Sequence, residues 1–385
     1  GELPEKLQDI APEQRPTWLG DRYVEGNNAY EDDETAKQEI ITVNKRVYEL
    51  HASGDHDSSF AQIYWTCRTW SYDYFKQFYD QLEVHQFDRT IPESEVVPLG
   101  LQTVREHVGD VYQESDGAIV FKGDDHGLHT RVFINSQGLP TYEAKDVGLL
   151  MTKWQDYHYD ESLYITANEQ AQYMQVMFKS VEQFAPEPAQ RARHLTHGTV
   201  KLQGGVKMSS RKGNVLLAVD ILEAATAANK AATGKDAQDT VLGAVKYAFL
   251  KNRIGGDIIY DPEESVSLEG NSGPYLQYAH ARARSILRKA DGPTALPQDL
   301  EAGERSLVRK ISEYTEVVDK AVAELMPHHI ATYLYELAQV FNRFYEHNRV
   351  IDDPRQNQRL GLVAQYADTL KSGLELLGIH APEQM

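Results

Sequence analysis

Apolar residues recur at alternating intervals of four and three over the last third of the chain. Three such stripes cover residues 307–325, 330–344 and 363–377. Because this spacing places each stripe on one face of an α-helix, each predicts an amphipathic helix. A fourth helix is expected over 274–289, and the connections are short. The pattern therefore predicts an antiparallel helical bundle at the C-terminal end.

The middle of the chain is typical of a mixed α/β structure. Residues 118–121 and 131–134 are short apolar runs that predict two strands, joined by a hairpin loop or a longer excursion. Residues 162–167 predict a further strand, residues 169–184 a helix and residues 196–202 a strand. A strand, a helix and a strand in succession favour a parallel βαβ unit. We therefore expect an α/β region followed by an all-α region.

Composition excludes several classes of protein. The 385 residues contain no run of 18 apolar residues, so no membrane-spanning helix is expected. The first residues lack a secretory pattern and Cys67 is the only cysteine, so we expect a cytoplasmic protein with neither a disulfide nor a cysteine-based zinc site. The formal charge of −19 argues at first sight against a polyanionic partner.

One segment departs from that acidic composition. Residues 201–214 read Lys-Leu-Gln-Gly-Gly-Val-Lys-Met-Ser-Ser-Arg-Lys-Gly-Asn, and no acidic residue lies between His194 and Val219. Its glycines permit close backbone approach, while its three later cations and two serines suit a polyphosphate whose charge is shifting. An exposed basic loop explains the composition equally well.

A motif within this segment favours the phosphate interpretation. Lys207-Met208-Ser209-Ser210 resembles the KMSKS signature of class I aminoacyl-tRNA synthetases, and Arg211-Lys212-Gly213-Asn214 resembles its continuation in arginyl-tRNA synthetases. Ser210 stands where lysine is usual, so either Arg211 or Lys212 supplies the second cation. Residues 142–146 (Tyr-Glu-Ala-Lys-Asp), 271–282, 341–345 and 376–385 also resemble that family, in the same order.

The resemblance implies an arginine–tRNA ligase that uses ATP with Mg²⁺, L-arginine and tRNA(Arg), without a structural metal. It implies roles for four groups of residues. Arginine would contact Tyr142, Asp146 and Gln170; ATP would contact His197, Gly198, Lys207 and Met208; the catalytic loop would use Lys207, Ser209, Ser210, Arg211 and Lys212; and tRNA would contact Tyr278, Arg282, Tyr345 and Met385. A guanidinium group carries five donors in a planar fork, which suits a carboxylate and an amide oxygen.

Several of these residues also have a simpler interpretation, as ordinary surface or core side chains. Taken alone, Asp146 is a solvated surface carboxylate, and only its place in the motif argues otherwise. His197 is as well explained as a packed core histidine. Tyr278 and Tyr345 lie on expected bundle helices, where aromatic residues are usually part of the core.

The resemblance also implies the domain organisation. Residues 1–264 would form part of a Rossmann-type catalytic domain with the KMSS loop, and residues 265–385 an α-helical anticodon-binding domain. The family's His-x-Gly-His signature is absent, and we interpret His107-Val108-Gly109-Asp110 as a chance match. We therefore expect a chain that lacks the first half of the nucleotide fold, exposes an apolar sheet edge or face unless another polypeptide covers it, and activates arginine poorly alone. The complete enzyme would be a monomer without a membrane partner.

Two other classes of function remain open. The first is a non-catalytic tRNA-binding or interaction protein derived from an arginyl-tRNA synthetase. The second is a metalloenzyme, because the pairs His126/His129 and His194/His197 have a spacing that can bind a metal on a helix. Both pairs lie in strand-like or loop-like segments and lack an obvious third ligand, which argues against a metal.

Overall fold

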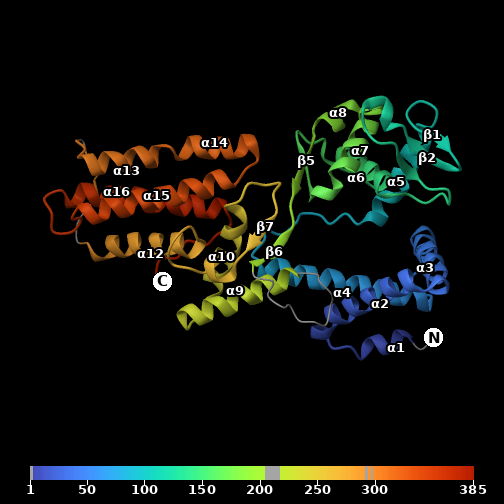
Figure 1. The fold of residues 1–385 in the computed structure, drawn as a ribbon, viewed down its shortest axis with the longest axis horizontal. Helices are drawn as coiled ribbons and strands as arrows, with labels where there is room; N and C mark the ends of the chain where they lie inside the picture. The colour runs from blue at the N-terminus through green and yellow to red at the C-terminus, as the bar shows by residue number, and fades with distance from the viewer. Residues whose placement is uncertain (1–2, 204–216, 291–293, 296, 298) are drawn as a thin grey trace. The chain divides into compact units, whose positions relative to one another are not determined.

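The computed structural model describes residues 3–203, 217–290, 294, 295, 297 and 299–385 (Figure 1). The described residues form two compact units, the first ending at Leu195 and the second beginning at Thr196. No helix among the described residues is long and apolar enough to cross a membrane. The division into functional domains at residues 264 and 265 stays a prediction.

The first unit begins with helices. These are α1 (Leu3–Gln8), α2 (Arg15–Asp32), α3 (Glu34–Ser53), α4 (Ser59–Gln81) and α5 (Glu93–Glu106), with a 3₁₀ turn over Pro12–Gln14. Asp33 separates α2 from α3, and its carboxylate accepts hydrogen bonds from the backbone N–H groups of Thr35 and Ala36, at 2.8 and 3.2 Å. This cap satisfies donors that the first turn of α3 leaves without partners.

The rest of the first unit is mixed α/β. It contains β1 (Gln113–Ser115), β2 (Ala118–Phe121), β3 (Arg131–Ile134), α6 (Tyr142–Tyr157), β4 (Ser162–Ala167), α7 (Ala171–Phe184), α8 (Pro186–Gln190) and β5 (Ala192–His197). Strands β1, β2 and β3 form one antiparallel sheet, and β4 pairs with β5 in another. The strands predicted over 118–121 and 131–134 are confirmed, and the segment between them contains a 3₁₀ turn, Gly123–His126.

Helices α5 and α6 pack closely against each other and carry the residues of the candidate site. Gly148 on α6 makes this approach possible, because a Cβ atom there would overlap the carbonyl oxygen of Val96 on α5. Beneath them a buried core joins α6 and α7 to the antiparallel sheet, with Val147, Met177 and Phe133 all fully buried. The site therefore rests on a well-packed part of this unit.

The strand predicted over 196–202 is wrong as a single element. Residues up to His197 belong to β5, whereas β6 (Val200–Leu202) pairs in parallel with β7 (Ile258–Tyr260) in a separate sheet. The chain turns between them at Gly198, where a Cβ atom would overlap the backbone of Gly256. Thr199 then donates its N–H to Asp257 at 2.9 Å. A contact with a segment some 60 residues later in the sequence thus divides the predicted strand into β5 and β6.

The second unit is mainly helical. After β6 come α9 (Ala218–Thr233), α10 (Gln238–Leu250), β7, α11 (Pro262–Ser265), α12 (Gly273–Lys289), α13 (Ala302–Ser312), α14 (Tyr314–Glu324), α15 (His328–His347) and α16 (Gln356–Leu376). Helices α12 to α16 share a core in which Leu276, Leu334 and Phe341 are fully buried. Figure 1 shows α13 to α16 lying along one another, as the apolar stripes predict.

The single helix predicted over 307–325 is also wrong, because the structure divides it into α13 and α14 at Glu313. The Tyr333 hydroxyl on α15 donates a hydrogen bond of 2.9 Å to the carbonyl of Lys310. In a continuous helix that carbonyl would accept from the N–H four residues later. No glycine or proline marks the break, so the local pattern contains no stop signal.

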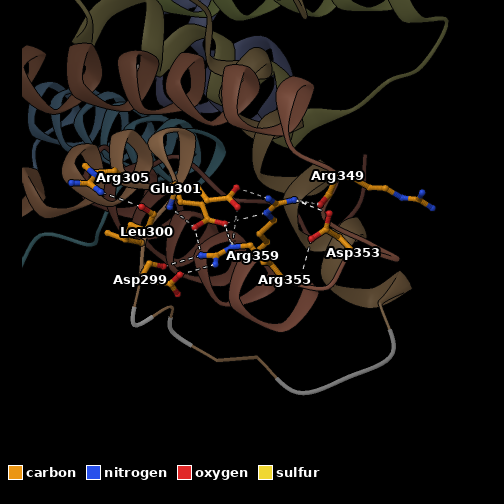
Figure 2. A network of polar contacts seen from close by, with 9 residues as sticks. Asp299, Leu300, Glu301, Arg305, Arg349, Asp353, Arg355 and Arg359 are labelled. Atoms are coloured by element: carbon orange, nitrogen blue, oxygen red, sulfur yellow. Dashed lines mark hydrogen bonds and ion pairs between the residues drawn. The ribbon is translucent and has the colours of Figure 1, made fainter.

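A network of charged side chains around the buried Glu304 holds the loops at one end of this bundle together (Figure 2). The Glu304 side chain is fully buried and accepts hydrogen bonds from the Nε atoms of Arg355 and Arg359, at 2.9 and 3.1 Å. Arg359 also binds the carboxylate of Glu301 at 2.9 Å and that of Asp353 at 3.2 Å. The network connects the start of α13 with the start of α16.

Candidate active site

The sheet β1–β3 fixes the beginning of α6. Thr141 precedes the helix, and its hydroxyl donates to the carbonyls of Val132 at 2.7 Å and Phe133 at 3.0 Å. The helix therefore begins at Tyr142, whose side chain is 64% exposed. Asp146 follows four residues later, so the two side chains share one face of α6. The structure thus brings these two predicted residues together.

Asp146 has a partner that the motif does not reveal. The Tyr173 hydroxyl, on α7, donates a hydrogen bond of 2.8 Å to its carboxylate. Burial raises the pKa of Asp146 most strongly; the hydrogen bond from Tyr173 opposes this, and the nearby carboxylates of Glu93 and Glu143 raise the pKa further. Asp146 is thus a half-buried carboxylate whose surroundings disfavour its negative charge. A cationic ligand beside it would stabilise that charge.

The charges around Asp146 leave the site negative. The Lys145 ammonium lies 2.6 Å from Glu93, and the Arg131 guanidinium lies 3.5 Å from the buried Glu143. Three carboxylates therefore face two cations. The Tyr142 ring adds a further surface for a cation, because the Lys145 Nζ lies 5.1 Å from its centroid. A planar guanidinium ligand fits this combination of carboxylate and aromatic ring.

Gln170 lies close in sequence to this group but does not join it. It is the last residue of a 3₁₀ turn, Asn168–Gln170, and its side chain is exposed one turn before Tyr173. The described structure has no hydrogen bond between Gln170 and Asp146. Its predicted contact with arginine stays a prediction.

The ATP residues are only partly within the described structure. His197 ends β5 and is exposed, with its Nδ1 2.9 Å from the Gly198 carbonyl, so its interpretation as a packed core histidine is wrong. Gly198 makes the turn into β6. The loop residues predicted to act on ATP lie outside the described residues: Lys207, Met208, Ser209, Ser210, Arg211 and Lys212.

Three of the predicted tRNA residues lie on α12 and α15. Tyr278 is 46% exposed, so its interpretation as a core residue is wrong. Arg282 follows one turn later, and its guanidinium lies 4.6 Å from the centroid of the Tyr345 ring. Tyr345 is partly buried against the bundle core and stacks on Phe341, so a core role explains part of its ring surface.

The fourth tRNA residue, Met385, ends a tail that α12 holds in place. Side chains of α12 donate to three backbone carbonyls of the tail: Gln277 to His380 at 2.9 Å, His280 to Pro382 at 2.8 Å and Arg288 to Glu383 at 2.9 Å. Met385 itself is 46% exposed. Arg284, also on α12, is paired with Asp368 at 2.8 Å.

Sequence reasoning missed Tyr173, Glu93 and Glu143. Tyr173 follows Gln170 by three residues at the start of a predicted helix, so the helical period could have placed both on one face. Glu143 lies within the motif itself but was given no role. Glu93 lies 52 residues before Lys145 in sequence, and only the packing of α5 on α6 brings them together.

The histidine pairs do not form a metal centre in the part of the chain that is described, which holds no cluster of three potential ligands. His194 instead lies 2.7 Å from the Thr166 hydroxyl, and His126 stacks on Phe121 with ring centroids 5.4 Å apart. Each of these two histidines therefore has a contact typical of a structural side chain.

Comparisons with known families agree with the order of the two regions. Residues 3–261 match the family described as tRNA synthetases class I (R), catalytic domain. Residues 276–385 match the DALR anticodon binding domain. The chain thus combines a class I aminoacyl-tRNA synthetase catalytic domain with a helical anticodon-binding domain.

Individual relatives indicate which family of class I synthetases the chain resembles. An arginine–tRNA ligase of Porphyromonas gingivalis is 32% identical over 86% of this chain, and one of Borreliella afzelii is 30% identical over 94%. The solved arginyl-tRNA synthetase of Thermus thermophilus is 26% identical, with a TM-score of 0.76 over 95% of this chain. The chain belongs to the arginyl-tRNA synthetase family. It spans 59% and 66% of the length of the two ligases.

Proposed function

We propose that the protein is an arginine–tRNA ligase that acts in the cytoplasm. It activates L-arginine with ATP, bound as its magnesium complex, and transfers the arginyl group to tRNA(Arg). The observation that carries this proposal is the half-buried Asp146, which shares a face of α6 with Tyr142 and whose local charges sum to a negative site. Such a site suits the guanidinium of arginine better than a neutral side chain.

In the first step the arginine carboxylate attacks the α-phosphorus of ATP, and pyrophosphate leaves. Asp146, Tyr142 and Gln170 hold the arginine side chain, so that its carboxylate is positioned for attack. No nucleophile from the protein is required. Negative charge develops on the leaving pyrophosphate during this step. Stabilising that charge lowers the activation barrier of the reaction.

The loop over 207–212 supplies that stabilisation in our proposal. Lys207 and one of Arg211 and Lys212 contribute positive charge, and Ser209 and Ser210 contribute hydroxyl donors. These groups act on charge that grows during the reaction, so they favour the transition state over bound ATP. His197, Gly198 and Met208 contact the ATP on the nucleoside side.

The bundle binds tRNA(Arg) through an exposed aromatic and basic surface. Tyr278 and Met385 are each 46% exposed and can contact unstacked bases, while Arg282 over Tyr345 offers a cation close to an aromatic face. RNA loops are read by stacking and by contacts to base edges, which this combination of side chains can provide.

A further polypeptide segment with the His-x-Gly-His half of the nucleotide fold completes the site in this proposal. Strand β4 supports this, because Leu163 and Ile165 are 40% and 66% exposed while Tyr164 between them is buried. An apolar sheet face of this kind is costly to leave in water. The completed enzyme would be a monomer.

The alternative is a non-catalytic tRNA-binding protein derived from this family. Its support is the bundle surface itself, where the exposed Tyr278 and Met385 can contact RNA without any reaction being catalysed. Under this alternative the bundle binds tRNA, while the Asp146 site has no reaction to perform.

The exchange of labelled pyrophosphate into ATP separates the two functions. It is measured with arginine and tRNA(Arg) present, on the chain alone and with a polypeptide that carries the missing half of the nucleotide fold. We expect exchange only in the complemented sample, and its loss in Asp146→Asn. The ligase proposal is wrong if tRNA binds with high affinity but the complemented chain catalyses no arginine-dependent exchange.

A further inference from the structure

A histidine on α12 lies beneath the C-terminal tail, which we define as residues 380–385. The side chain of this residue, His280, is fully buried. Its Nδ1 atom lies 2.8 Å from the carbonyl oxygen of Pro382 in the tail, and its Nε2 atom lies 3.2 Å from the Nε atom of Arg284. Both ring nitrogens are therefore engaged, one by the tail and the other by the helix that carries the histidine.

These two contacts define the protonation state of His280. The Pro382 carbonyl can only accept a hydrogen bond, so Nδ1 must carry a proton. The guanidinium of Arg284 can only donate, so Nε2 must keep its lone pair. His280 is therefore neutral, with its proton on Nδ1. A second proton on the ring would place an N–H group of the imidazolium against the N–H group of Arg284.

Arg284 is held in place by two carboxylates from different elements. It lies 2.8 Å from Asp368 on α16 and 3.4 Å from Glu383 in the tail. Moving the guanidinium away from a protonated His280 would break both ion pairs. The arrangement of α12, α16 and the tail therefore favours a neutral imidazole ring.

The surroundings of the ring act on its pKa in both directions. Burial lowers the pKa of His280 most strongly, and the hydrogen bond to the Pro382 carbonyl opposes this effect. The positive charges of Arg284 and of Lys371, on α16, lower the pKa further, whereas the negative charge of Glu383 raises it. The pKa lies below its ordinary value of about 6.5, because burial and the two cations outweigh the opposing contacts.

The bond to Pro382 helps to set where the end of the tail lies. Ala381 is buried in the bundle core, whereas Met385 is 46% exposed. Pro382 is the first residue after this buried position and lies three residues before Met385. Its hydrogen bond to His280 therefore acts on the segment that carries Met385 to the surface.

We propose that neutral His280 is a positioning residue for tRNA binding, which holds the tail and Met385 against α12 and loses this hold when the ring is protonated. The inference rests on the proposed function, in which Met385 contacts tRNA(Arg). Docking of the tail should not change with pH well above about 6.5. It should weaken by up to about tenfold for each pH unit below that value, because the released tail leaves His280 free to bind one more proton.

A thiol introduced by Ala381→Cys can report on docking of the tail, in a chain that also carries Cys67→Ala. Position 381 is only 6% exposed, so a disulfide reagent should label it when the tail is released. Labelling of a peptide of residues 376–385 with the same substitution, at the same pH, corrects for ionisation of the thiol. We expect protection relative to this peptide to fall by about three- to tenfold between pH 7.5 and pH 5.5.

Two variants show whether His280 is the group that titrates. His280→Asn keeps a donor near the position of Nδ1 but has no imidazole, so its protection should be the same at both pH values. The matched control is His380→Asn, because His380 also belongs to the tail and lies 3.3 Å from Asp239, but its side chain is 57% exposed. This control should retain the full pH dependence. Constant protection in the chain with His280 intact, or an equal fall in His280→Asn, would overturn the inference.

Nitrogen-15 NMR of the imidazole ring keeps the inference testable if His280→Asn does not fold. The ring should be neutral with its proton on Nδ1 and should have a pKa below about 6.5. Deleting residues 381–385 should return this pKa toward about 6.5. A proton on Nε2 of the neutral ring, or a pKa that deletion does not raise, contradicts the proposed role.

The same thiol tests whether docking of the tail contributes to tRNA binding. At pH 7.5, saturating tRNA(Arg) should increase protection at position 381 by about threefold or more, because a ligand that contacts the docked tail stabilises it. If tRNA(Arg) binds without changing protection, the tail has no part in binding and the inference is wrong. If tRNA(Arg) does not bind at all, the proposed function fails, whereas the pH profile measured without tRNA still tests the contact between His280 and the tail.

Discussion

Glu304 offers the sharpest test of how the anticodon-binding bundle is held together. We expect Glu304→Gln to destabilise this bundle while leaving the first unit unchanged. The substitution keeps the size of the side chain but removes the charge that faces Arg355 and Arg359. Arg359 would keep Glu301 and Asp353, and Arg355 would keep Asp299, so the remaining carboxylates compensate only in part.

The expected magnitude follows from the pKa of Glu304. Burial alone would raise this pKa, but hydrogen bonds from Arg355, the Glu301 backbone N–H and Arg359 lower it from 4.5 to about 2. This difference corresponds to about 3 kcal/mol of folding free energy. Because the folded pKa is the lower one, the contribution is present above pH 4.5 and is lost as the pH falls toward 2. Breaking a buried ion pair by removing one partner typically costs about 3–5 kcal/mol, which agrees.

The position of the tryptophans makes the assay selective. All four of them, Trp18, Trp65, Trp70 and Trp154, precede residue 195, so tryptophan fluorescence reports on the first unit. Hydrogen exchange of peptides from α13 and α16 reports on the bundle. At pH 7 we expect Glu304→Gln to accelerate exchange in these peptides by a factor of about 100, as a loss of about 3 kcal/mol implies, with an unshifted tryptophan transition in urea.

The matched control is Glu336→Gln. Glu336 lies 2.6 Å from Lys310, but its side chain is 50% exposed. Exposed ion pairs contribute less than about 1 kcal/mol, so this variant should change exchange only slightly. Equal exchange in Glu304→Gln and the unmodified chain at pH 7 would refute the argument, as would a difference that persists undiminished at pH 3.

Three further predictions concern the site. Tyr173→Phe should raise the pKa of Asp146 further, because the lost hydrogen bond opposes the effect of burial; a ¹³C carboxyl titration measures this, and an unchanged or lower pKa contradicts the assignment. Deleting Met385 should weaken tRNA(Arg) binding without changing thermal unfolding, since the carbonyls that anchor the tail end at Glu383; equal tRNA affinity would exclude its role. In the complete enzyme, Lys207→Ala should slow formation of arginyl-adenylate by about tenfold or more while changing ATP affinity less, and rapid-quench kinetics that show an unchanged rate would exclude Lys207.

The order of structural regions could be predicted from local patterns, but two boundaries could not. The helical period correctly predicted α15 and α16, because each buries one stripe of its own residues. The break at Glu313 depends on the Tyr333 hydroxyl, and the break at Gly198 depends on the backbone of Gly256. Both are contacts between segments far apart in sequence, which no local period contains.

The candidate site could likewise be predicted only where its residues lie close together in the sequence. Tyr142 and Asp146 lie four residues apart on one helix, so their proximity follows from the sequence once that helix is recognised. Tyr173 and Glu93 reach Asp146 from α7 and α5, and the charge balance of the site depends on them. The exposure of Tyr278 could not be predicted either, because an aromatic residue on a bundle helix is equally consistent with the core.

The way in which α12 holds the C-terminal tail determines what can vary there. Gln277, His280 and Arg288 donate hydrogen bonds to main-chain carbonyls of the tail, at His380, Pro382 and Glu383, and Arg288 also lies 3.5 Å from the Glu383 carboxylate. The three hydrogen bonds to carbonyls do not depend on which side chains the tail carries. Substitution of exposed tail residues such as His380 and Gln384 is therefore compatible with the same path, whereas Ala381 is buried in the bundle core. Inserting or deleting one residue would shift the position of Met385 along α12. The main-chain hydrogen bonds at this end of the protein therefore depend on the length of the tail more than on the identity of its exposed side chains.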